Sequence, residues 1–294
     1  MKVVTIGTSY VDIKGFPSGT FIPAGRNAGR IEQVHGGVAR NIAEDIAHMG
    51  IESVLLSLVD DTGIGMDVIA HLKEQGICTD YIKAVPGGLG MWLAVFDDKG
   101  DVCANVSART DMTPLCDILD AEGDELIGSA DGVLIEMDLD ECVMKSVFEL
   151  AAKHGIGVYG VISNMTIASK RLEYIKQCAC FVCNKQEAGQ LFETDTSALD
   201  AGTMQWLLSE KITEMGIPCM IVTLGGDGAV YAAVDGRKGF CPAQKTQVVD
   251  TTGAGDSFFA GASVILIGGG SLDEACMTGT KLASKVISST SNVY

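Results

Sequence analysis

Short apolar runs alternate with amphipathic stretches along most of this chain. The apolar runs are bounded by Gly or Asp and have the length of buried strands, which are expected at residues 3–6, 53–59, 132–136, 157–162, 179–183 and 219–224. Helices are expected at residues 38–49, 66–75, 141–153, 185–192, 204–215, 256–267 and 272–288. This alternation is typical of βαβ units, so the chain is predicted to be an α/β protein with a largely parallel sheet.

Two regions depart from this alternation. Residues 10–35 are rich in Gly and Pro, and residues 91–106 read as two strands about a turn at 97–100. Both are expected to belong to a small β-sheet, with strands from about 10–35 and 88–108, that is appended to the main sheet and covers a cleft. The sequence contains no internal repeat or low-complexity linker, so residues 1–294 are predicted to form a single domain.

Composition and charge narrow the classes of partner. The chain has 294 residues, of which 47% are hydrophobic and 20% charged, so it can bury a large core. Its formal net charge of -17 argues against nucleic acid and anionic membranes, because either partner requires a basic face. The first apolar run is too short for a signal peptide, and no stretch approaches the roughly 20 apolar residues of a membrane span. A cytoplasmic protein is expected.

The ten cysteines are scattered without paired spacings, which favours reduced thiols that pack as small apolar side chains. Cys180 and Cys183 form a CxxC pair, where a structural zinc ion is the alternative. The sequence offers no second CxxC or Cys/His pair to complete four ligands. A buried strand is therefore the favoured interpretation of this segment.

The most informative motif is a loop of small residues near the C-terminus. Residues 250–261 read Asp-Thr-Thr-Gly-Ala-Gly-Asp-Ser-Phe-Phe-Ala-Gly, so the loop runs into an apolar helix. Backbone N–H groups of such a loop and of a helix N-terminus form an anion site. Asp256 would lie beside the anion and could accept a proton from an attacking hydroxyl group. The alternative is that Asp256 caps the helix, and the loop alone does not decide between the two.

Two further motifs stand at expected helix starts. Gly36, Gly37 and Asn41 open the first long helix and allow a polar ligand to approach the backbone, although a tight turn is the simpler explanation of the glycines. Asn184 and Glu187 follow the strand expected at 179–183, at the edge of the sheet where α/β proteins bind ligands. They are either a helix-capping pair or polar ligands that organise Mg²⁺.

Polar or glycine-rich positions also follow other expected strands. Thr223, Gly225 and Gly228 form a turn that admits a nucleotide phosphate or base edge, but the turn also suits a β-hairpin. Asp12 and Glu136 are carboxylates at strand ends that can accept sugar hydroxyl groups, although isolated residues of this kind are more often solvated. The sequence contains no Walker A motif, no GxGxxG after the first strand, and no GxSxG or HExxH.

These motifs occur in the order and at the spacing of the ribokinase-like (PfkB) carbohydrate kinases, and the chain resembles that family over its whole length. The resemblance implies a three-layer α/β/α fold with a mostly parallel central sheet and a small β-sheet lid over the sugar. It also implies that ATP with Mg²⁺ is the phosphoryl donor and that the γ-phosphoryl group passes to a sugar hydroxymethyl group.

The resemblance assigns a role to each motif. Asp256 would be the catalytic base, and Gly253, Ala254 and Gly255 would form the anion hole. The residues expected to meet the sugar are Asp12, Gly36, Gly37, Asn41, Glu136 and Asp256. The residues expected to meet the nucleotide are Asn184, Thr223, Gly225, Gly228, Gly253 and Gly255.

Metal sites are implied in the same way. Glu187 would hold Mg²⁺, through water, while Asp250 and Thr252 would supply a monovalent cation site for K⁺. The lid is the surface through which a homodimer is expected. A small sugar or nucleoside is the expected partner.

Within the family, the segment at residues 36–43 and the one at 27–31 look most similar to the pseudouridine kinases, which phosphorylate the ribose 5'-hydroxyl group of that nucleoside. The chain departs from the family pattern at Tyr10, where Asn is usual, and at Gly160 and Val161, where Asp-Pro is common. Other sugar kinases of the family (of ribokinase, fructokinase or adenosine kinase type) are therefore alternatives.

Two alternatives come from other functional classes. A sensor of sugars or nucleosides that has lost catalysis would explain the departures at Tyr10 and Gly160, but the intact Asp256 opposes it. A nicotinamide-dependent oxidoreductase would have a similar sheet, but the missing GxGxxG opposes it.

Overall fold

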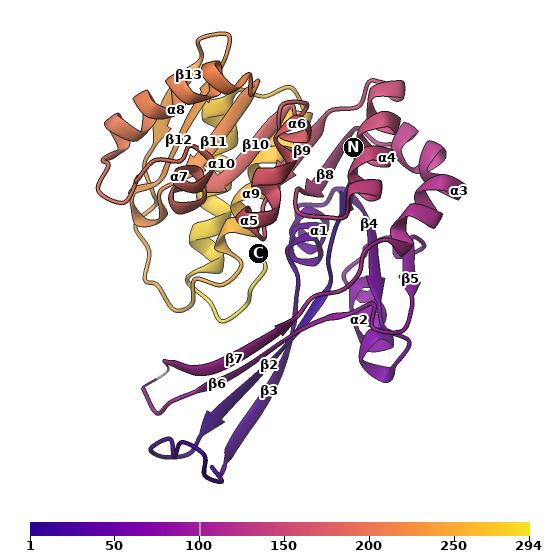
Figure 1. Cartoon of the computed structure of the whole chain (residues 1–294), viewed down its shortest axis with the longest axis vertical. Helices are drawn as coiled ribbons and strands as arrows, with labels where there is room; N and C mark the ends of the chain where they lie inside the picture. The colour runs from indigo at the N-terminus through magenta and orange to yellow at the C-terminus, as the bar shows by residue number, and fades with distance from the viewer. Residues whose placement is uncertain (100) are drawn as a thin grey trace.

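A computed structural model describes residues 1–99 and 101–294 (Figure 1). Within these residues, nine strands form a central sheet in the order β13-β12-β11-β10-β9-β8-β1-β4-β5. Neighbours from β5 to β11 pair in parallel, and β12 and β13 are added antiparallel. The strands are β1 Lys2–Ile6, β4 Glu52–Val59, β5 Ile82–Ala84, β8 Gly132–Glu136, β9 Val158–Val161, β10 Cys180–Asn184, β11 Cys219–Thr223, β12 Ala229–Ala233 and β13 Lys238–Cys241.

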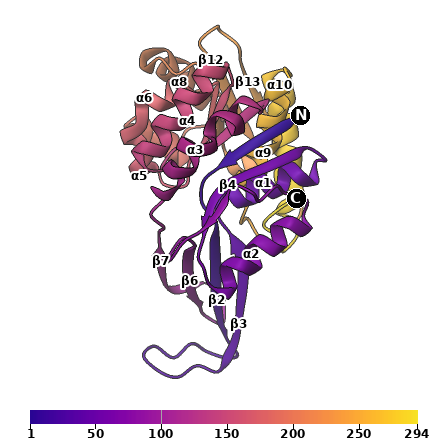
Figure 2. The same ribbon diagram turned by 90° about the vertical axis from the view of Figure 1, so that its right-hand side faces the viewer.

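Helices cover both faces of this sheet, as Figure 2 shows. One face packs against α3 Pro114–Gly128, α4 Glu141–His154, α5 Met165–Ala168, α6 Leu172–Ile175, α7 Lys185–Leu191 and α8 Ala201–Met215. The other packs against α1 Val38–His48, α2 Gly63–Glu74, α9 Ala254–Ile267 and α10 Leu272–Val286. Short 3₁₀ turns occur at η1 Ser169–Arg171 and η2 Gly225–Asp227. The predicted three-layer α/β/α fold is confirmed. Among the described helices, none has the length and apolar character needed to cross a bilayer.

Helix α3 is the main element that the pattern analysis omits. It carries Gly123 in its interior, which lowers its intrinsic helix propensity. Leu119 and Leu126 are nevertheless buried in the core. Gly123 brings α3 close to α4, because a Cβ atom at this position would lie 2.7 Å from Leu150 Cδ1. Tertiary packing therefore stabilises a helix that local propensity does not reveal.

A second sheet, called the lid sheet here, extends away from the body of the protein (Figure 1). Its order is β3-β2-β6-β7, and the strands are β2 Tyr10–Pro17, β3 Gly29–Gly36, β6 Gly90–Phe96 and β7 Val102–Ala108. The separate small sheet expected from the sequence is thus present. In the predicted turn, the Asp97 carboxylate accepts hydrogen bonds from the backbone N–H groups of Lys99 at 2.8 Å and Asp101 at 2.9 Å. Gly100 of that turn lies outside the described residues.

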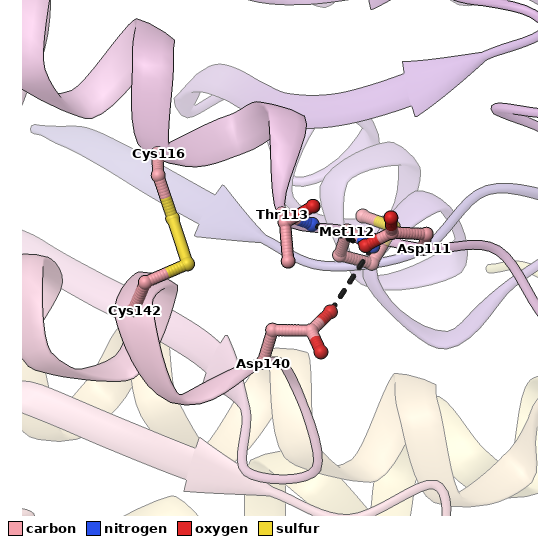
Figure 3. The surroundings of a disulfide bond; sticks show 6 residues. All are labelled: Asp111, Met112, Thr113, Cys116, Asp140 and Cys142. Carbon is pink, nitrogen blue, oxygen red and sulfur yellow. Dashed lines mark hydrogen bonds between the residues drawn. A yellow bond between two sulfur atoms is a disulfide. The ribbon is translucent and has the colours of Figure 1, made fainter.

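The cysteines correct one expectation. Cys116 of α3 and Cys142 of α4 form a disulfide, so the chain does not hold all ten cysteines as free thiols (Figure 3). The two residues lie 26 positions apart in unrelated sequence contexts, and only the packing of α3 on α4 brings them together. Beside the bridge, the Asp140 carboxylate accepts a hydrogen bond from Met112 N at 3.1 Å. Cys180 and Cys183 lie buried in β10, as the strand interpretation predicts.

Replacing Cys116 by Ser is expected to lower the free energy of unfolding by about 3 kcal/mol, because the crosslink restricts the unfolded chain across 26 residues. Thermal unfolding of the oxidised protein, with and without a thiol reductant, measures the effect. Cys103→Ser is the matched control, since Cys103 is an exposed free thiol on β7. Equal melting temperatures for Cys116→Ser and oxidised wild type would show that the bridge does not form in solution.

Candidate active site

Two cavities flank the loop at residues 251–256. The first, called the lid-side cavity, has a volume of about 460 Å³ and lies at the root of the lid sheet. Its wall is formed by Thr8, Tyr10, Asp12, Gly36, Gly37, Val38, Asn41, Ser107, Arg109, Ser163, Asn164, Thr252, Gly253, Asp256 and Asn292. The second, called the helix-side cavity, has a volume of about 400 Å³ and lies against α9 and α10. Thr251, Ala254 and Gly255 line it, so one loop forms a wall of both cavities.

The loop ends at the N-terminus of α9. Gly253 is the N-cap residue and has φ of 79°, and a Cβ atom there would lie 1.9 Å from the carbonyl oxygen of Asn292. Only glycine fits this position. No side chain among the described residues caps α9, so the N–H groups of its first turn remain available to an anion.

Asp256 does not cap the helix, so the capping alternative is wrong. Its Oδ2 accepts a hydrogen bond from Asn41 Nδ2 at 2.6 Å, and Oδ1 has no hydrogen-bond partner in the part of the chain that the structure describes. Burial raises the pKa of Asp256 to about 7, although the hydrogen bond from Asn41 opposes this shift. A carboxylate with such a pKa on a cavity wall is suited to accept a proton near neutral pH.

Asn41 is itself held by residues that the sequence analysis does not identify. Arg40 is fully buried, forms an ion pair with Glu44 at 2.6 Å, and donates through Nη2 to Asn41 Oδ1. Asn292 Nδ2 donates to the same oxygen at 3.4 Å. The amide oxygen of Asn41 thus accepts, which turns its amide nitrogen toward Asp256. The partners of Arg40 lie within α1 and just before it. No local sequence signal marks Asn292, because its role arises from contacts between α1 and the end of the chain.

The predicted sugar residues are mostly brought together. Gly36, Gly37, Asn41 and Asp12 line the lid-side cavity, and burial raises the pKa of the Asp12 carboxyl group. Gly37 precedes α1 with φ of 99°, and a Cβ atom there would lie 2.5 Å from the carbonyl oxygen of Thr8. The backbone conformation therefore requires glycine at this helix start.

Glu136 lies one layer behind the cavity rather than on its wall. Its Oε1 accepts hydrogen bonds from Thr8 N at 2.8 Å, Thr8 Oγ1 at 2.9 Å and Ala39 N at 2.9 Å. Burial raises the pKa of Glu136. The contacts place it as a support that joins β8 to the segments carrying Thr8 and Ala39.

Asn184 and Glu187 form the capping box that the sequence offered as an alternative. Asn184 Oδ1 accepts from Glu187 N at 2.9 Å, and Asn184 N donates to Glu187 Oε2 at 2.8 Å. Glu187 Oε1 has no hydrogen-bond partner among residues 1–99 and 101–294. Burial raises the pKa of Glu187, and the nearby charge of Asp138 adds to the shift.

Thr223, Gly225 and Gly228 meet in the helix-side cavity, where β11 turns through η2 into the antiparallel β12. The turn is therefore a hairpin and a cavity wall at once. The structure adds residues of α9, α10 and the segment after β13 to this wall, among them Gln244, Lys245, Phe258, Ala283, Ser284 and Ile287. These residues come from segments that lie far apart along the chain, which explains why no sequence motif marked them.

The departures from the family pattern also have structural consequences. The Tyr10 ring lies over Gly90, where a Cβ atom would approach it to 2.4 Å, so the larger side chain is matched by a glycine on β6. A Cβ atom at Gly160 would lie 2.8 Å from Met137 Sδ, so a side chain there would disturb the core. Asp250 Oδ1 accepts from Thr252 N at 2.9 Å and Thr252 Oγ1 at 2.8 Å, which orders the start of the loop.

Known proteins resemble this chain over nearly its whole length. The model of the pfkB family carbohydrate kinases matches residues 1–293. The chain is 31% identical over 295 residues to guanosine-inosine kinase of Exiguobacterium acetylicum, covering 99% of this chain and 96% of that protein. It is 26% identical over 270 residues to pseudouridine kinase of Escherichia coli (strain K12), covering 91% of this chain and 84% of that protein. The structure of Arabidopsis thaliana ribokinase complexed with ribose and ATP superimposes on this chain with a TM-score of 0.84 at 19% identity. The match covers 99% of this chain and 93% of the ribokinase.

The chain belongs to the pfkB family of carbohydrate kinases. It is a carbohydrate or nucleoside kinase with a ribokinase-like fold. The likeness to pseudouridine kinase is confirmed as homology, but the chain shares higher identity with guanosine-inosine kinase. Sequence identity therefore does not single out the acceptor.

The two glycines of the loop are expected to respond differently to alanine. Gly255→Ala places a methyl group in open space on the wall of the helix-side cavity, so the melting temperature should stay unchanged while KM for ATP rises. Gly253→Ala forces a positive φ and a clash with Asn292, so the melting temperature should fall. Thermal unfolding and initial-rate kinetics measure both effects. Gly202→Ala on α8 is the control. An unaltered KM for ATP in Gly255→Ala would show that ATP does not contact this wall of the helix-side cavity.

Asp256→Asn is expected to raise the melting temperature at pH 8. The folded carboxyl group has a pKa of about 7, whereas an unfolded Asp loses its proton near pH 4, so ionisation destabilises the fold as the pH rises through this interval. The neutral amide removes that penalty. The difference from wild type should shrink between pH 8 and pH 5, and Asp120→Asn on the exposed side of α3 is the control. An equal or lower melting temperature at pH 8 would contradict the raised pKa.

Proposed function

We propose that the protein transfers the γ-phosphoryl group of ATP to a hydroxymethyl group of a nucleoside or sugar bound in the lid-side cavity. The observation that carries this proposal is that the loop at 251–256 lines two cavities. A nucleotide in the helix-side cavity and an acceptor in the lid-side cavity would meet at this loop. Its N–H groups can hold the negative charge of the group in transfer.

In this mechanism Asp256 is the general base. Asn41 donates a hydrogen bond to Asp256 Oδ2, which leaves Asp256 Oδ1 free. Oδ1 accepts the proton of the acceptor hydroxyl group as the hydroxyl oxygen attacks phosphorus. Arg40 and Asn292 fix the direction of the Asn41 amide and so act as positioning residues. Asp12 accepts hydrogen bonds from ring hydroxyl groups of the acceptor, since it lines the same cavity on β2.

The residues near the loop also fit a divalent cation. Glu187 has one carboxylate oxygen outside its capping box, and its charge acts on Asp256. A bound Mg²⁺ would offset the repulsion between these acidic groups and neutralise phosphate charge. Glu187 would hold the ion, through water, as the sequence resemblance implies.

The acceptor we propose is a nucleoside, because two related proteins carry nucleosides in their names. The relatives are a guanosine-inosine kinase and a pseudouridine kinase. Pseudouridine and the purine nucleosides guanosine and inosine are thus the first compounds to test. Ribose remains the alternative, since the family also includes ribokinases.

Three further features are proposed from the same resemblance. Backbone oxygens of Asp250 and Thr252 would bind K⁺, which the ordered turn at Asp250 supports. A homodimer would form through the lid sheet, where Ile31, Leu93 and Val106 share one face and are exposed. The protein would act in the cytoplasm, where ATP and nucleosides are available.

Asp256→Asn is expected to lower kcat roughly 10²- to 10⁴-fold, because the acceptor hydroxyl group loses its base. The dissociation constant for ATP should stay close to that of wild type, since the N–H groups of the loop are retained. A coupled ADP-release assay and calorimetric titration measure the two quantities. In wild type, kcat/KM should rise with pH and level off above a pKa near 7.

Two results would contradict this function. Unchanged turnover in Asp256→Asn would remove Asp256 from the mechanism. Ligand binding to wild type without ADP release, for every sugar and nucleoside offered, would instead indicate a sensor that keeps the fold and lacks catalysis.

A further inference from the structure

One part of the lid-side cavity is not used by phosphoryl transfer. It lies where the lid sheet joins the central sheet, and its centre is Arg109, the residue directly after β7. Arg109 Nη2 donates to Asp138 Oδ2 at 2.9 Å, and the Asp138 side chain is 0% exposed. Ser163 Oγ donates to the same carboxylate oxygen at 2.8 Å. The guanidinium group is therefore held in one orientation against the end of β8.

Arg109 keeps donors that face the cavity. Its side chain is 39% exposed, and Nε and Nη1 have no hydrogen-bond partner within the described part of the chain. A guanidinium group has donors only, because it cannot lose a proton at physiological pH. It is therefore suited to bind a carbonyl oxygen and opposes an amino group at the same position of a ligand.

Strand register adds an aromatic side chain to the same face of the lid sheet as Ser107. Trp92 on β6 pairs with Asp12 on β2 and with Ser107 on β7. Paired residues in neighbouring strands point to the same face of a sheet. Because Asp12 and Ser107 both line the cavity, Trp92 lies on the cavity-facing side of the lid sheet. Its partly buried indole offers a flat surface for an aromatic ring.

The charges around this wall select a neutral ligand. Asp12 and Asp256 line the cavity, Glu136 and Asp138 lie behind it, and Arg109 is the one Lys or Arg among the lining residues. The charge of Arg109 is matched by the buried Asp138. An acceptor that already carries a phosphate group would meet net negative charge here, whereas a neutral group with oxygen acceptors would not.

We propose that Arg109, Ser107 and Trp92 bind an oxo-nucleobase, so that the acceptor is a neutral nucleoside whose base presents carbonyl oxygen. Guanosine, inosine and pseudouridine have such a base, whereas adenosine presents an amino group and ribose has no base. The base stacks on Trp92 and its carbonyl accepts from Arg109. This inference rests on the proposed function, since it places the acceptor in the lid-side cavity.

The first experiment compares kcat/KM for inosine, adenosine and ribose in wild type, Arg109→Met and Arg109→Lys. Hydrogen bonds to a charged group contribute about 1.5–3 kcal/mol, so Arg109→Met should lower kcat/KM for inosine roughly 10- to 150-fold. The kcat/KM values for adenosine and ribose should change less than threefold. For inosine, kcat/KM of Arg109→Lys should lie between those of wild type and Arg109→Met. Arg26→Met, which removes an exposed arginine between β2 and β3, is the matched control.

A second experiment measures binding without catalysis. The chain has two tryptophans, and Trp206 is 60% exposed on α8, so Trp206→Phe leaves Trp92 as the only indole. Inosine should quench the fluorescence of this variant in the absence of ATP, and ribose should not. Adding Arg109→Met should raise the inosine concentration that gives half of the quenching at least tenfold.

The outcomes separate this inference from the proposed function. Equal losses for all three acceptors in Arg109→Met would mean that Arg109 only holds the lid, and would overturn the inference. Wild-type turnover of ribose in preference to inosine would also overturn it while leaving the kinase function intact. Quenching by inosine without any ADP release would support the base site and contradict the kinase function.

Discussion

The hydrogen bond between Asn41 and Asp256 is the interaction on which the rest of the site depends. It joins α1 to α9 and fixes a carboxylate that burial pushes toward its protonated form. Asn41 can donate to Asp256 because Arg40 and Asn292 occupy its oxygen. The Asp256 carboxylate is thus oriented by a buried polar network whose members come from three separate segments of the chain, and such networks are stable only when each member is satisfied.

The fold places this network where chemistry can use it. Parallel strands β1, β8, β10 and β11 end at one edge of the sheet. Asn184 and Thr223 are the last residues of β10 and β11, and Thr8 and Asp138 come just after β1 and β8. The loop before α9 crosses that edge and separates the two cavities. In the proposed function, backbone N–H groups would face the nucleotide while Asp256 would face the acceptor. The lid sheet lines the first cavity from the opposite side.

Much of this arrangement follows from the sequence. Apolar runs indicate six strands of the central sheet, turn signals indicate the lid sheet, and the small residues before α9 indicate that helix, which begins two residues before the expected start at Asp256. The strands β5, β12 and β13 were not predicted. Helix α3 was not predicted because packing on α4 offsets the interior Gly123, and the Cys116–Cys142 bridge was not predicted because it depends on that packing. Arg109 and Asn292 carry no local signal, since their partners lie far away in the chain. Glu136 has the predicted strand end but supports the wall from behind.

The central claim is that one loop holds the phosphoryl group between two ligands. A crystal structure of the protein with inosine and a non-hydrolysable ATP analogue tests it directly. We expect the analogue in the helix-side cavity, its γ-phosphate against the N–H groups of residues 253–255, and the nucleoside 5'-hydroxyl group within hydrogen-bonding distance of Asp256 Oδ1. A γ-phosphate bound away from this loop, or a nucleoside hydroxymethyl group turned away from Asp256, would contradict the account.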